Sequence, residues 1–271
     1  MVALILGLGA PLHAEAAGTL RYVALGDSFA AGPGLAPITD GACGRGQGYP
    51  EIAARALGAT TFTNATCSGA RVEHMAGVQP GSRGPQLDAL RPDTDLVTLN
   101  LGLNDSYVLW TIQVCAYLQW LAPGGAPCTV LLNPLGFNLV GSHLHAQAGS
   151  LDQTLQAIHQ RSPRAKVLVV GVPAVVPDQP SACPDGPYGP GDMPYLSGVV
   201  RELNTMLRAR AAANAATFVD TYTPSVGHDA CQQPGIKWME GPALVHEGVA
   251  LHPNHAGMAA SATAVVRAAQ G

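Results

Sequence analysis

Short apolar segments recur along the chain, and each is bounded by glycine, proline or polar residues that are typical of turns. The segments are rich in aliphatic and β-branched side chains, the composition of strands that are buried on both faces. We predict five such strands: Tyr22–Gly26, Thr60–Asn64, Leu96–Leu101, Lys166–Gly171 and Thr217–Asp220.

Between these segments, apolar residues are spaced three and four positions apart, which is the period of an amphipathic helix. The pattern predicts helices over Pro50–Leu57, Gln86–Leu90, Leu144–Gln160, Leu196–Asn214 and Ala256–Ala269. Strands that alternate with helices form a parallel sheet with helices on both faces. We therefore predict an α/β fold: a single domain of three layers, α/β/α, around a parallel sheet of about five strands. Ligands of such folds bind at the carboxyl edge of the sheet.

Two stretches interrupt this alternation. Leu103–Val140 is long and contains Trp110, and Val172–Pro194 is dense in proline and glycine. Long irregular loops in a compact domain are usually functional or disordered. Because both stretches contain cysteines, we expect irregular loops that are cross-linked and form walls of a substrate cleft. The alternative is that they are surface loops far from any site.

The first residues form an apolar run, Val2–Leu12, that is too short to span a bilayer. It is followed by Ala14-Glu15-Ala16, which fits a cleavage site with small residues. The pattern predicts a secretory signal over residues 1–17 and one folded domain over residues 18–271. No Lys or Arg precedes the run, so either the printed start lies inside the true signal or the chain is not exported.

Composition narrows the functional classes. The chain of 271 residues is 47% hydrophobic and 12% charged, with a formal net charge of −4. It can bury one substantial core. An acidic balance without a basic patch argues against nucleic acid or an anionic membrane surface as a partner. We expect no stable insertion into a membrane, and a monomer.

Six cysteines, an even number, all follow the predicted signal. The absence of any Cys-x-x-Cys pair argues against a zinc knuckle or a thioredoxin-like motif. Six cysteines allow 15 connectivities, and the spacing does not choose among them. They are expected to form disulfides outside the cell, and the alternative is six reduced cysteines in a cytosolic protein.

Four separated blocks carry candidate chemistry. Gly26-Asp27-Ser28 follows the first predicted strand, where a tight turn presents a serine beside the free N–H groups of a helix start. Taken alone, this tripeptide is more often a helix cap. Three further blocks follow in order: Gly69 in Asn64–Gly69, Asn104 in Gly102–Asp105, and His252 in His252–Asn254.

In this order the blocks resemble the SGNH (GDSL) hydrolase family, which is named for these four residue types, and the similarity runs from Arg21 to the last helix. The cysteine spacing and the segment Gly227–Cys231 look most like its secreted actinobacterial lipases and esterases. The resemblance implies a flavodoxin-like SGNH fold and a secreted serine esterase or lipase that hydrolyses carboxylic acyl esters without cofactor or metal. It also implies three disulfides: Cys43–Cys67, Cys115–Cys128 and Cys183–Cys231.

The family's roles fall on matching positions of this chain. Ser28 would be the nucleophile and His252 its general base. The oxyanion hole would comprise the backbone N–H groups of Ser28 and Gly69 and the side-chain amide of Asn104. Gly69 and Asn104 could instead have purely structural roles, because Gly69 permits a positive φ and Asn104 can form an Asx turn.

The group that orients His252 departs from the family pattern. Most members place an aspartate three residues before the histidine, and this chain has Val249 there. We expect a backbone carbonyl of Val249 or Ala250 to hold the imidazole in a Ser-His dyad, and the alternatives are Glu247 and Asp229. A carbonyl fixes the tautomer but supplies no full charge.

Other functions remain as alternatives. Phospholipid acyl hydrolysis and carbohydrate deacetylation would use the same residues. A metal site from His246, His252 and His255 lacks supporting carboxylates or cysteines. A nucleotide or flavin module lacks the G-x-G-x-x-G turn. A further alternative is a binding protein of the cell envelope without catalytic activity, because Val249 stands where most family members have an aspartate. The apolar stretch around Trp110 suggests a hydrophobic acyl pocket.

Overall fold

The computed structural model describes residues 19–82, 84–121, 125–136, 138–183 and 188–271, and the predicted signal lies outside this range. Five parallel strands form a single sheet in the order β2-β1-β3-β4-β5. The predicted fold class is therefore confirmed, with each strand close to its expected position. The strands are β1 Arg21–Gly26, β2 Thr61–Asn64, β3 Leu96–Asn100, β4 Lys166–Val170 and β5 Thr217–Val219.

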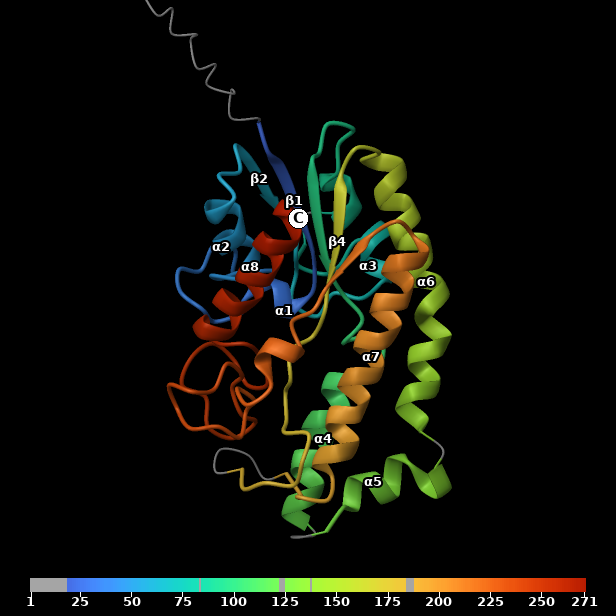
Figure 1. The fold of residues 1–271 in the computed structure, drawn as a ribbon, viewed down its shortest axis with the longest axis vertical. Coiled ribbons are helices and arrows are strands. Elements are labelled where there is room, and N and C mark those ends of the chain that lie inside the picture. The colour runs from blue at the N-terminus through green and yellow to red at the C-terminus, as the bar shows by residue number, and fades with distance from the viewer. Residues whose placement is uncertain (1–18, 83, 122–124, 137, 184–187) are drawn as a thin grey trace, which may run out of the picture.

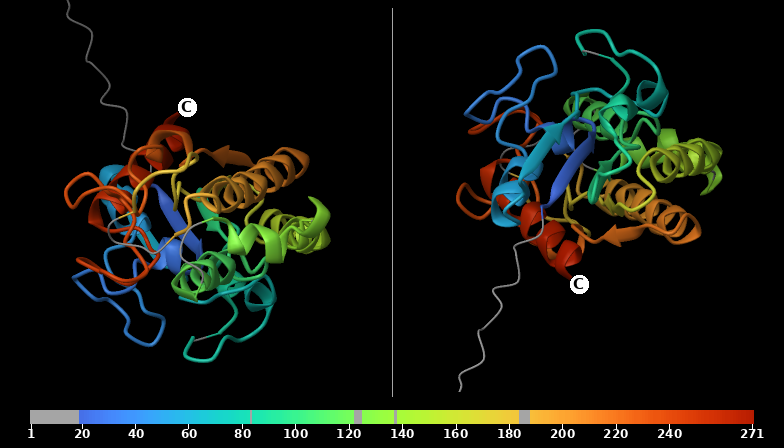
Figure 2. Two further views of the ribbon diagram at one scale, coloured as in Figure 1. Left: turned by 90° about the horizontal axis from the view of Figure 1, so that it is seen from below. Right: turned by 90° about the horizontal axis from the view of Figure 1, so that it is seen from above.

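Helices cover both faces of the sheet (Figure 1). Alternate residues of β1 point to opposite faces, so that Ala24 belongs to one core and Leu25 to the other. Views along the strands show the sheet between its two helical layers (Figure 2). The helices on the Ala24 face are α2 Tyr49–Ala56 and α8 His255–Gln270, and the two longest helices, α6 Leu139–Arg161 and α7 Met193–Ala213, lie on the Leu25 face.

The stretch after β3 differs from the prediction. Two helices replace most of the irregular loop expected over Leu103–Val140: α4 Val108–Leu121 and α5 Pro127–Leu132. Apolar side chains lie on all sides of α4, so its sequence lacks the contrast between two faces that marks an amphipathic helix. The helix α6 also begins five residues before the predicted Leu144.

The remaining helical segments are short. The predicted helix Gln86–Leu90 is a 3₁₀ helix, η1 Gln86–Ala89, with two further 3₁₀ turns, η2 Pro134–Gly136 and η3 Thr223–Ser225. Two single-turn helices follow strand ends, α1 Ser28–Ala31 after β1 and α3 Glu73–Ala76 after β2. Within the described residues, the predicted loop Val172–Pro194 is irregular until α7 begins at Met193.

Three disulfides join segments that leave the carboxyl ends of the strands. The pairs are those that the family resemblance implies: Cys43–Cys67, Cys115–Cys128 and Cys183–Cys231. Each constrains the unfolded chain and contributes about 2–4 kcal/mol to stability. The cross-links therefore stabilise the end of the molecule at which sheets of this type bind ligands.

Both ends of the described chain lie at the opposite, amino edge of the sheet. Strand β1 begins at Arg21, near the first described residue. At the other terminus, the Lys166 ammonium at the start of β4 donates to the carbonyl of Ala269 in α8 at 3.2 Å. In Figure 1 the blue start of β1 lies at the end of the sheet that faces away from α4 and α5.

Candidate active site

The turn after β1 places Ser28 at the carboxyl edge of the sheet. Gly26 has φ 146°, and a Cβ built there would lie 2.4 Å from the carbonyl oxygen of Asn100 in the neighbouring strand. Only glycine fits this turn. The backbone N–H of Asp27 donates to the same carbonyl at 3.0 Å, and the Asp27 carboxylate accepts from the N–H of Phe29 at 2.9 Å. Asp27 thus caps α1, in which Ser28 is the first residue.

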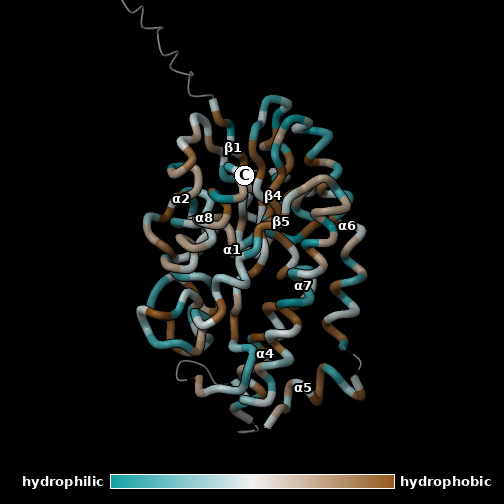
Figure 3. Tube along the Cα trace, in the orientation of Figure 1, coloured by the Kyte–Doolittle hydropathy of each residue, from teal (hydrophilic) through white to brown (hydrophobic). Residues whose placement is uncertain are grey.

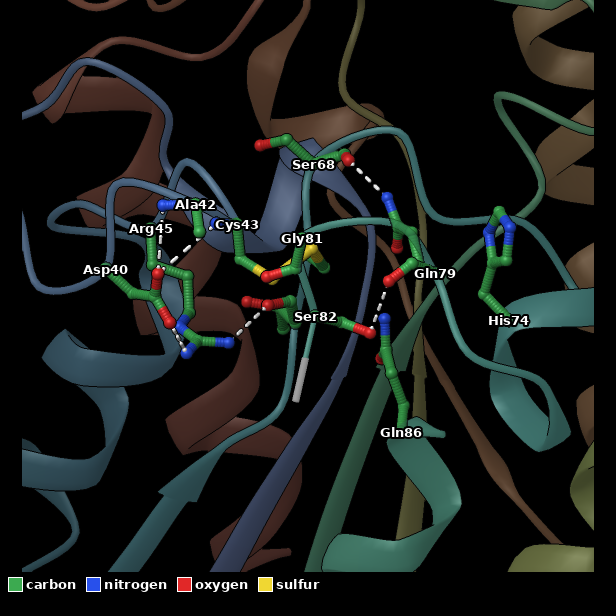
Figure 4. Close-up of a disulfide and its surroundings, with 12 residues drawn as sticks. Asp40, Ala42, Cys43, Arg45, Ser68, His74, Gln79, Gly81, Ser82 and Gln86 are labelled. Atoms are coloured by element: carbon green, nitrogen blue, oxygen red, sulfur yellow. Dashed lines mark hydrogen bonds and ion pairs between the residues drawn. A yellow bond between two sulfur atoms is a disulfide. The ribbon is translucent and has the colours of Figure 1, made fainter. Parts of the chain in front are cut away.

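A buried glutamine also fixes this turn. The Oε1 atom of Gln86 accepts from the Gly26 N–H at 2.7 Å, and its Nε2 atom donates to the Gly26 carbonyl at 2.9 Å. Both backbone groups at the end of β1 are therefore satisfied by one side chain from η1. This role was not predicted from the sequence, since the contact joins residues 60 positions apart and has no local pattern. Figure 4 shows Gln86 beside the loop of Gln79 and Ser82.

The structure brings His252 to Ser28. Its Nε2 atom lies 2.7 Å from the Ser28 Oγ atom, and its Nδ1 atom lies 2.7 Å from the carbonyl oxygen of Ala250. A carbonyl can only accept, so Nδ1 carries the proton and Nε2 is free to accept one from the serine. Burial lowers the pKa of His252, and the hydrogen bond to Ala250 opposes this effect. The imidazole is thereby kept neutral, the form that a general base requires.

The residue before the histidine explains how a carbonyl two residues away can reach the ring. Leu251 has φ 61°, in the left-handed region that a leucine rarely adopts, and its side chain is buried. This conformation turns the chain back on itself, so that the Ala250 carbonyl faces the His252 side chain. Strain of this kind needs support from the surrounding structure.

The two carboxylates that were considered as alternatives have other partners. Glu247 lies 3.0 Å from the Nδ1 atom of His255 and also accepts from the His255 backbone N–H. Asp229 accepts from the N–H of Cys231 at 3.0 Å and from Gln232. Of the groups considered for this role, the Ala250 carbonyl lies within hydrogen-bond distance of the His252 ring.

A buried ion pair supports the loop that carries His252. The Lys237 ammonium lies 3.0 Å from the Glu240 carboxylate, and both side chains are almost completely buried. The backbone N–H of Glu240 donates to the His252 carbonyl at 2.9 Å, and its carboxylate accepts from the His246 N–H and the Asn254 amide. Nothing in the sequence near the motif indicated this role for Glu240.

The blocks of Gly69 and Asn104 meet beside the serine turn. The Cys67 N–H donates to the Gly26 carbonyl at 3.0 Å, which attaches the Gly69 loop to the end of β1. Gly69 itself has φ 77°, and the Cys43–Cys67 disulfide two residues earlier fixes the loop (Figure 4). The Asn104 amide donates to the Ala70 carbonyl at 2.9 Å and lies 3.4 Å from the Asp27 carboxylate.

The Asp27 carboxyl is fully buried below the serine. Burial raises its pKa to about 7, the negative charge of Asp105 adds to this rise, and the hydrogen bond from Phe29 opposes it. Burial likewise raises the pKa of Asp105, while its bond from the Val72 N–H opposes the rise. The site therefore contains a carboxyl group that changes its charge near neutral pH.

An apolar groove adjoins the histidine. Its volume is about 310 Å³, and one wall is α4 while the other is the loop that leads to His252. Trp110, which suggested an acyl pocket in the sequence, is more than half exposed and lies outside this lining. The lining residues are Gln113, Ala116, Tyr117, Pro242, Ala243, Ala250 and Leu251.

Among the described residues, no group of three or more histidine, cysteine, aspartate or glutamate side chains could hold a metal ion. His255, one of the three histidines considered as metal ligands, bonds instead to Glu247 and, through Nε2, to the Ala36 carbonyl. In the part of the chain that the structure describes, no helix has the length and apolarity needed to cross a membrane.

Comparisons with known proteins establish the family of the chain. Lipase 2 of Streptomyces coelicolor is 37% identical over 251 residues, which cover 90% of this chain and 84% of that protein. The crystal structure of the extracellular lipase of Streptomyces rimosus superposes with a TM-score of 0.77 at 27% identity, covering 93% of this chain and all of that one. Phospholipase A1 of Streptomyces albidoflavus gives the same TM-score at 24% identity, which shows the shared fold. The profile of the GDSL-like Lipase/Acylhydrolase family matches residues 24–260, so the chain belongs to this family and is an ester hydrolase.

Proposed function

We propose that the chain is a secreted serine esterase or lipase that cleaves carboxylic acyl esters through an acyl-enzyme on Ser28. One observation carries the proposal: the His252 imidazole bridges the Ser28 hydroxyl and the Ala250 carbonyl, at 2.7 Å from each. A neutral imidazole in this position accepts the serine proton as the bond to the substrate forms.

In the acylation step, the Ser28 Oγ atom attacks the ester carbonyl carbon while its proton moves to the Nε2 atom of His252. The carbonyl oxygen becomes an oxyanion, and the proposed donors to it are the N–H groups of Ser28 and Gly69 and the Asn104 amide. When the tetrahedral intermediate collapses, the bond to the alcohol oxygen breaks. That oxygen takes the proton from Nε2 and leaves as the alcohol.

Deacylation repeats these steps with water as the nucleophile. His252 removes a proton from the water, the hydroxide oxygen attacks the acyl carbon, and Ser28 recovers its proton as the carboxylic acid is released. The Ala250 carbonyl stabilises the imidazolium through the Nδ1 hydrogen bond during both steps. Its partial charge is weaker than that of a carboxylate, so we expect a slower enzyme than one with a full triad.

The groove beside His252 supports an apolar acyl chain as the substrate portion. Its lining is mainly apolar, and Tyr117 and Leu251 contribute hydrophobic surface, the latter from the position directly before the histidine. Binding sites for small ligands share this mainly apolar character. The groove therefore favours esters with an alkyl chain over acetylated carbohydrates.

Two further parts of the proposal concern the cell. Residues 1–17 are proposed as a signal that is removed on export, and residues 18–271 as the catalytic domain, acting as a monomer outside the cell. The three disulfides support this compartment, because stable disulfides are rare in reducing cytosol. Sequencing the amino terminus of protein recovered from culture medium tests the cleavage.

Hydrolysis of p-nitrophenyl esters tests the chemistry. Ser28→Ala and His252→Ala should each lower kcat by about 10⁴-fold or more. His255→Ala is the matched control, since this histidine lies three residues along and pairs with Glu247. Glu247→Gln should also retain activity. Full activity of Ser28→Ala would show that Ser28 is not the nucleophile. Loss of activity in Glu247→Gln would show that a carboxylate, and not the Ala250 carbonyl, orients His252.

A second variant tests the groove. Ala243 lies exposed at its wall, so Ala243→Phe should narrow the groove without disturbing the core. We expect kcat/KM to fall for esters of long acyl chains and to stay unchanged for acetate esters. An equal fall for both would place the acyl chain elsewhere.

A further inference from the structure

One segment of the chain lacks formal charge. Residues 106–151 contain no Asp, Glu, Lys or Arg, although such residues make up 12% of the whole chain. The segment includes α4, α5, η2 and the first half of α6. A surface built from this segment carries no Lys or Arg side chain that would attract an anionic partner.

Apolar side chains of this segment are exposed at one end of the molecule. The relative exposure is 75% for Val130, 56% for Leu131 and 99% for Leu135. We call these three residues the apolar tip. They lie in α5 and η2, and Figure 1 places α5 at the end of the molecule to which the carboxyl ends of the strands point. Figure 3 shows hydrophobic residues along α5.

The apolar tip is held in place by polar and covalent contacts behind it. The disulfide Cys115–Cys128 joins α5 to α4. The buried Asp192 carboxylate accepts from the N–H groups of Cys128 and Thr129 at 3.1 and 2.8 Å, and from the Thr129 hydroxyl at 2.8 Å. These bonds satisfy the amino end of α5, so the helix presents its apolar side chains to solvent from a fixed base.

The apolar tip continues toward the acyl groove through α4. An open groove of about 800 Å³ lies at the tip, and all the side chains that line it are apolar: Leu118, Ala126, Pro127, Val130, Leu131 and Pro134. Leu118 follows Tyr117, which lines the acyl groove and is itself 67% exposed. One helix therefore contributes hydrophobic side chains to both grooves.

We propose that the apolar tip docks the enzyme on the surface of a neutral or zwitterionic lipid aggregate, and this rests on the proposed ester hydrolysis. Such a surface matches the absence of charge over residues 106–151 and accepts aliphatic side chains below its headgroups. Exposed aromatic residues on α4, Trp110 and Tyr117, suit the boundary between headgroups and water. Docking here brings the acyl groove to the lipid without a membrane-spanning helix.

Vesicles of a dialkyl-ether phosphatidylcholine test the docking, because ether lipids cannot be hydrolysed and binding is read apart from activity. Wild-type protein should co-sediment with them, and 0.5 M NaCl should leave binding unchanged. The double variant Leu131→Ser/Leu135→Ser should lower the partition coefficient at least about tenfold, since two leucyl side chains lose their transfer from water. Val226→Ser is the matched control, a 53% exposed aliphatic outside the segment.

Hydrolysis of p-nitrophenyl acetate separates docking from catalysis. The double variant should keep the wild-type kcat/KM for this soluble ester. The proposal would be overturned if the wild type did not bind the vesicles, or if Val226→Ser lost as much vesicle binding as the double variant. Binding that occurs only to anionic vesicles at low salt would also overturn it. Ultracentrifugation that shows a dimer abolished by the double variant, without vesicle binding, would assign the tip to a second copy instead. An inactive wild type that still binds would refute the proposed function alone.

Discussion

The buried Asp27 carboxyl makes a prediction about the pH dependence of stability. Asp27→Asn replaces a group that can ionise by one of the same shape that cannot. The amide oxygen can still accept from the Phe29 N–H, so the cap on α1 is retained. The variant also loses the oxygen that accepts from the Asn104 amide, so the cost of a negative charge below Ser28 is read from how the stability difference changes with pH.

The magnitude follows from the two pKa values. Burial raises the pKa of Asp27 from 3.8 to about 7, so the folded protein keeps a proton that the unfolded chain releases at lower pH. The favourable contribution is fully present below 3.8 and is lost as the pH rises through about 7. A pKa difference of one corresponds to about 1.4 kcal/mol, which gives about 4 kcal/mol in total and about 3 kcal/mol between about pH 4.5 and 8.

Urea unfolding of both proteins at several pH values measures this difference. Relative to Asp27→Asn, the wild-type free energy of unfolding should fall by about 3 kcal/mol as the pH rises from about 4.5 to 8. The control Asp93→Asn removes a more than half exposed carboxylate that pairs with Arg21 away from the site, and it shows how much such a group contributes to the curve. Parallel curves for wild type and Asp27→Asn would refute the reasoning.

Three further predictions concern catalysis and the histidine loop. Asn104→Ala should lower kcat by about 10²–10³-fold with an unchanged near-UV circular dichroism spectrum, and an unchanged kcat would remove this amide from the oxyanion hole. Because burial lowers the pKa of His252 below 6.5, kcat/KM should fall with decreasing pH only below that value, and a midpoint above it would contradict the assignment. Glu240→Gln removes the carboxylate that lies 3.0 Å from the buried Lys237 ammonium, so urea unfolding should show a loss of about 3–5 kcal/mol, and a change below about 1 kcal/mol would contradict this role for the pair.

The three central strands β1, β3 and β4 could be predicted because they are buried on both faces, whereas the edge strands β2 and β5 are partly exposed. All residues of β3 are buried, and such continuous apolar runs stand out between turn residues. Helices could be predicted where apolar and polar side chains lie on opposite faces, as in α7. The helix α4 was missed because it is apolar all round, and α5 because six residues are too few to show a period.

Part of the candidate site could likewise be predicted from the sequence, and part could not. Ser28 and His252 were identified by a motif whose blocks follow strand ends, and the structure brings them within hydrogen-bond distance. The choice of the Ala250 carbonyl depends on the positive φ of Leu251, and no residue type at that position announces it. Gln86 and Glu240 act through contacts between distant parts of the chain, which only the folded structure reveals.

The position of the two chain ends has a practical consequence for immobilising the enzyme. The end of α8 contacts the start of β4 through Ala269 and Lys166, while Ser28 lies at the opposite edge of the sheet. A support coupled through a tag after Gly271 would hold the protein with its candidate site facing the solution. Its kcat/KM for a soluble ester should equal that of the free enzyme, whereas coupling through a cysteine introduced at Leu244, near the acyl groove, should obstruct substrate entry.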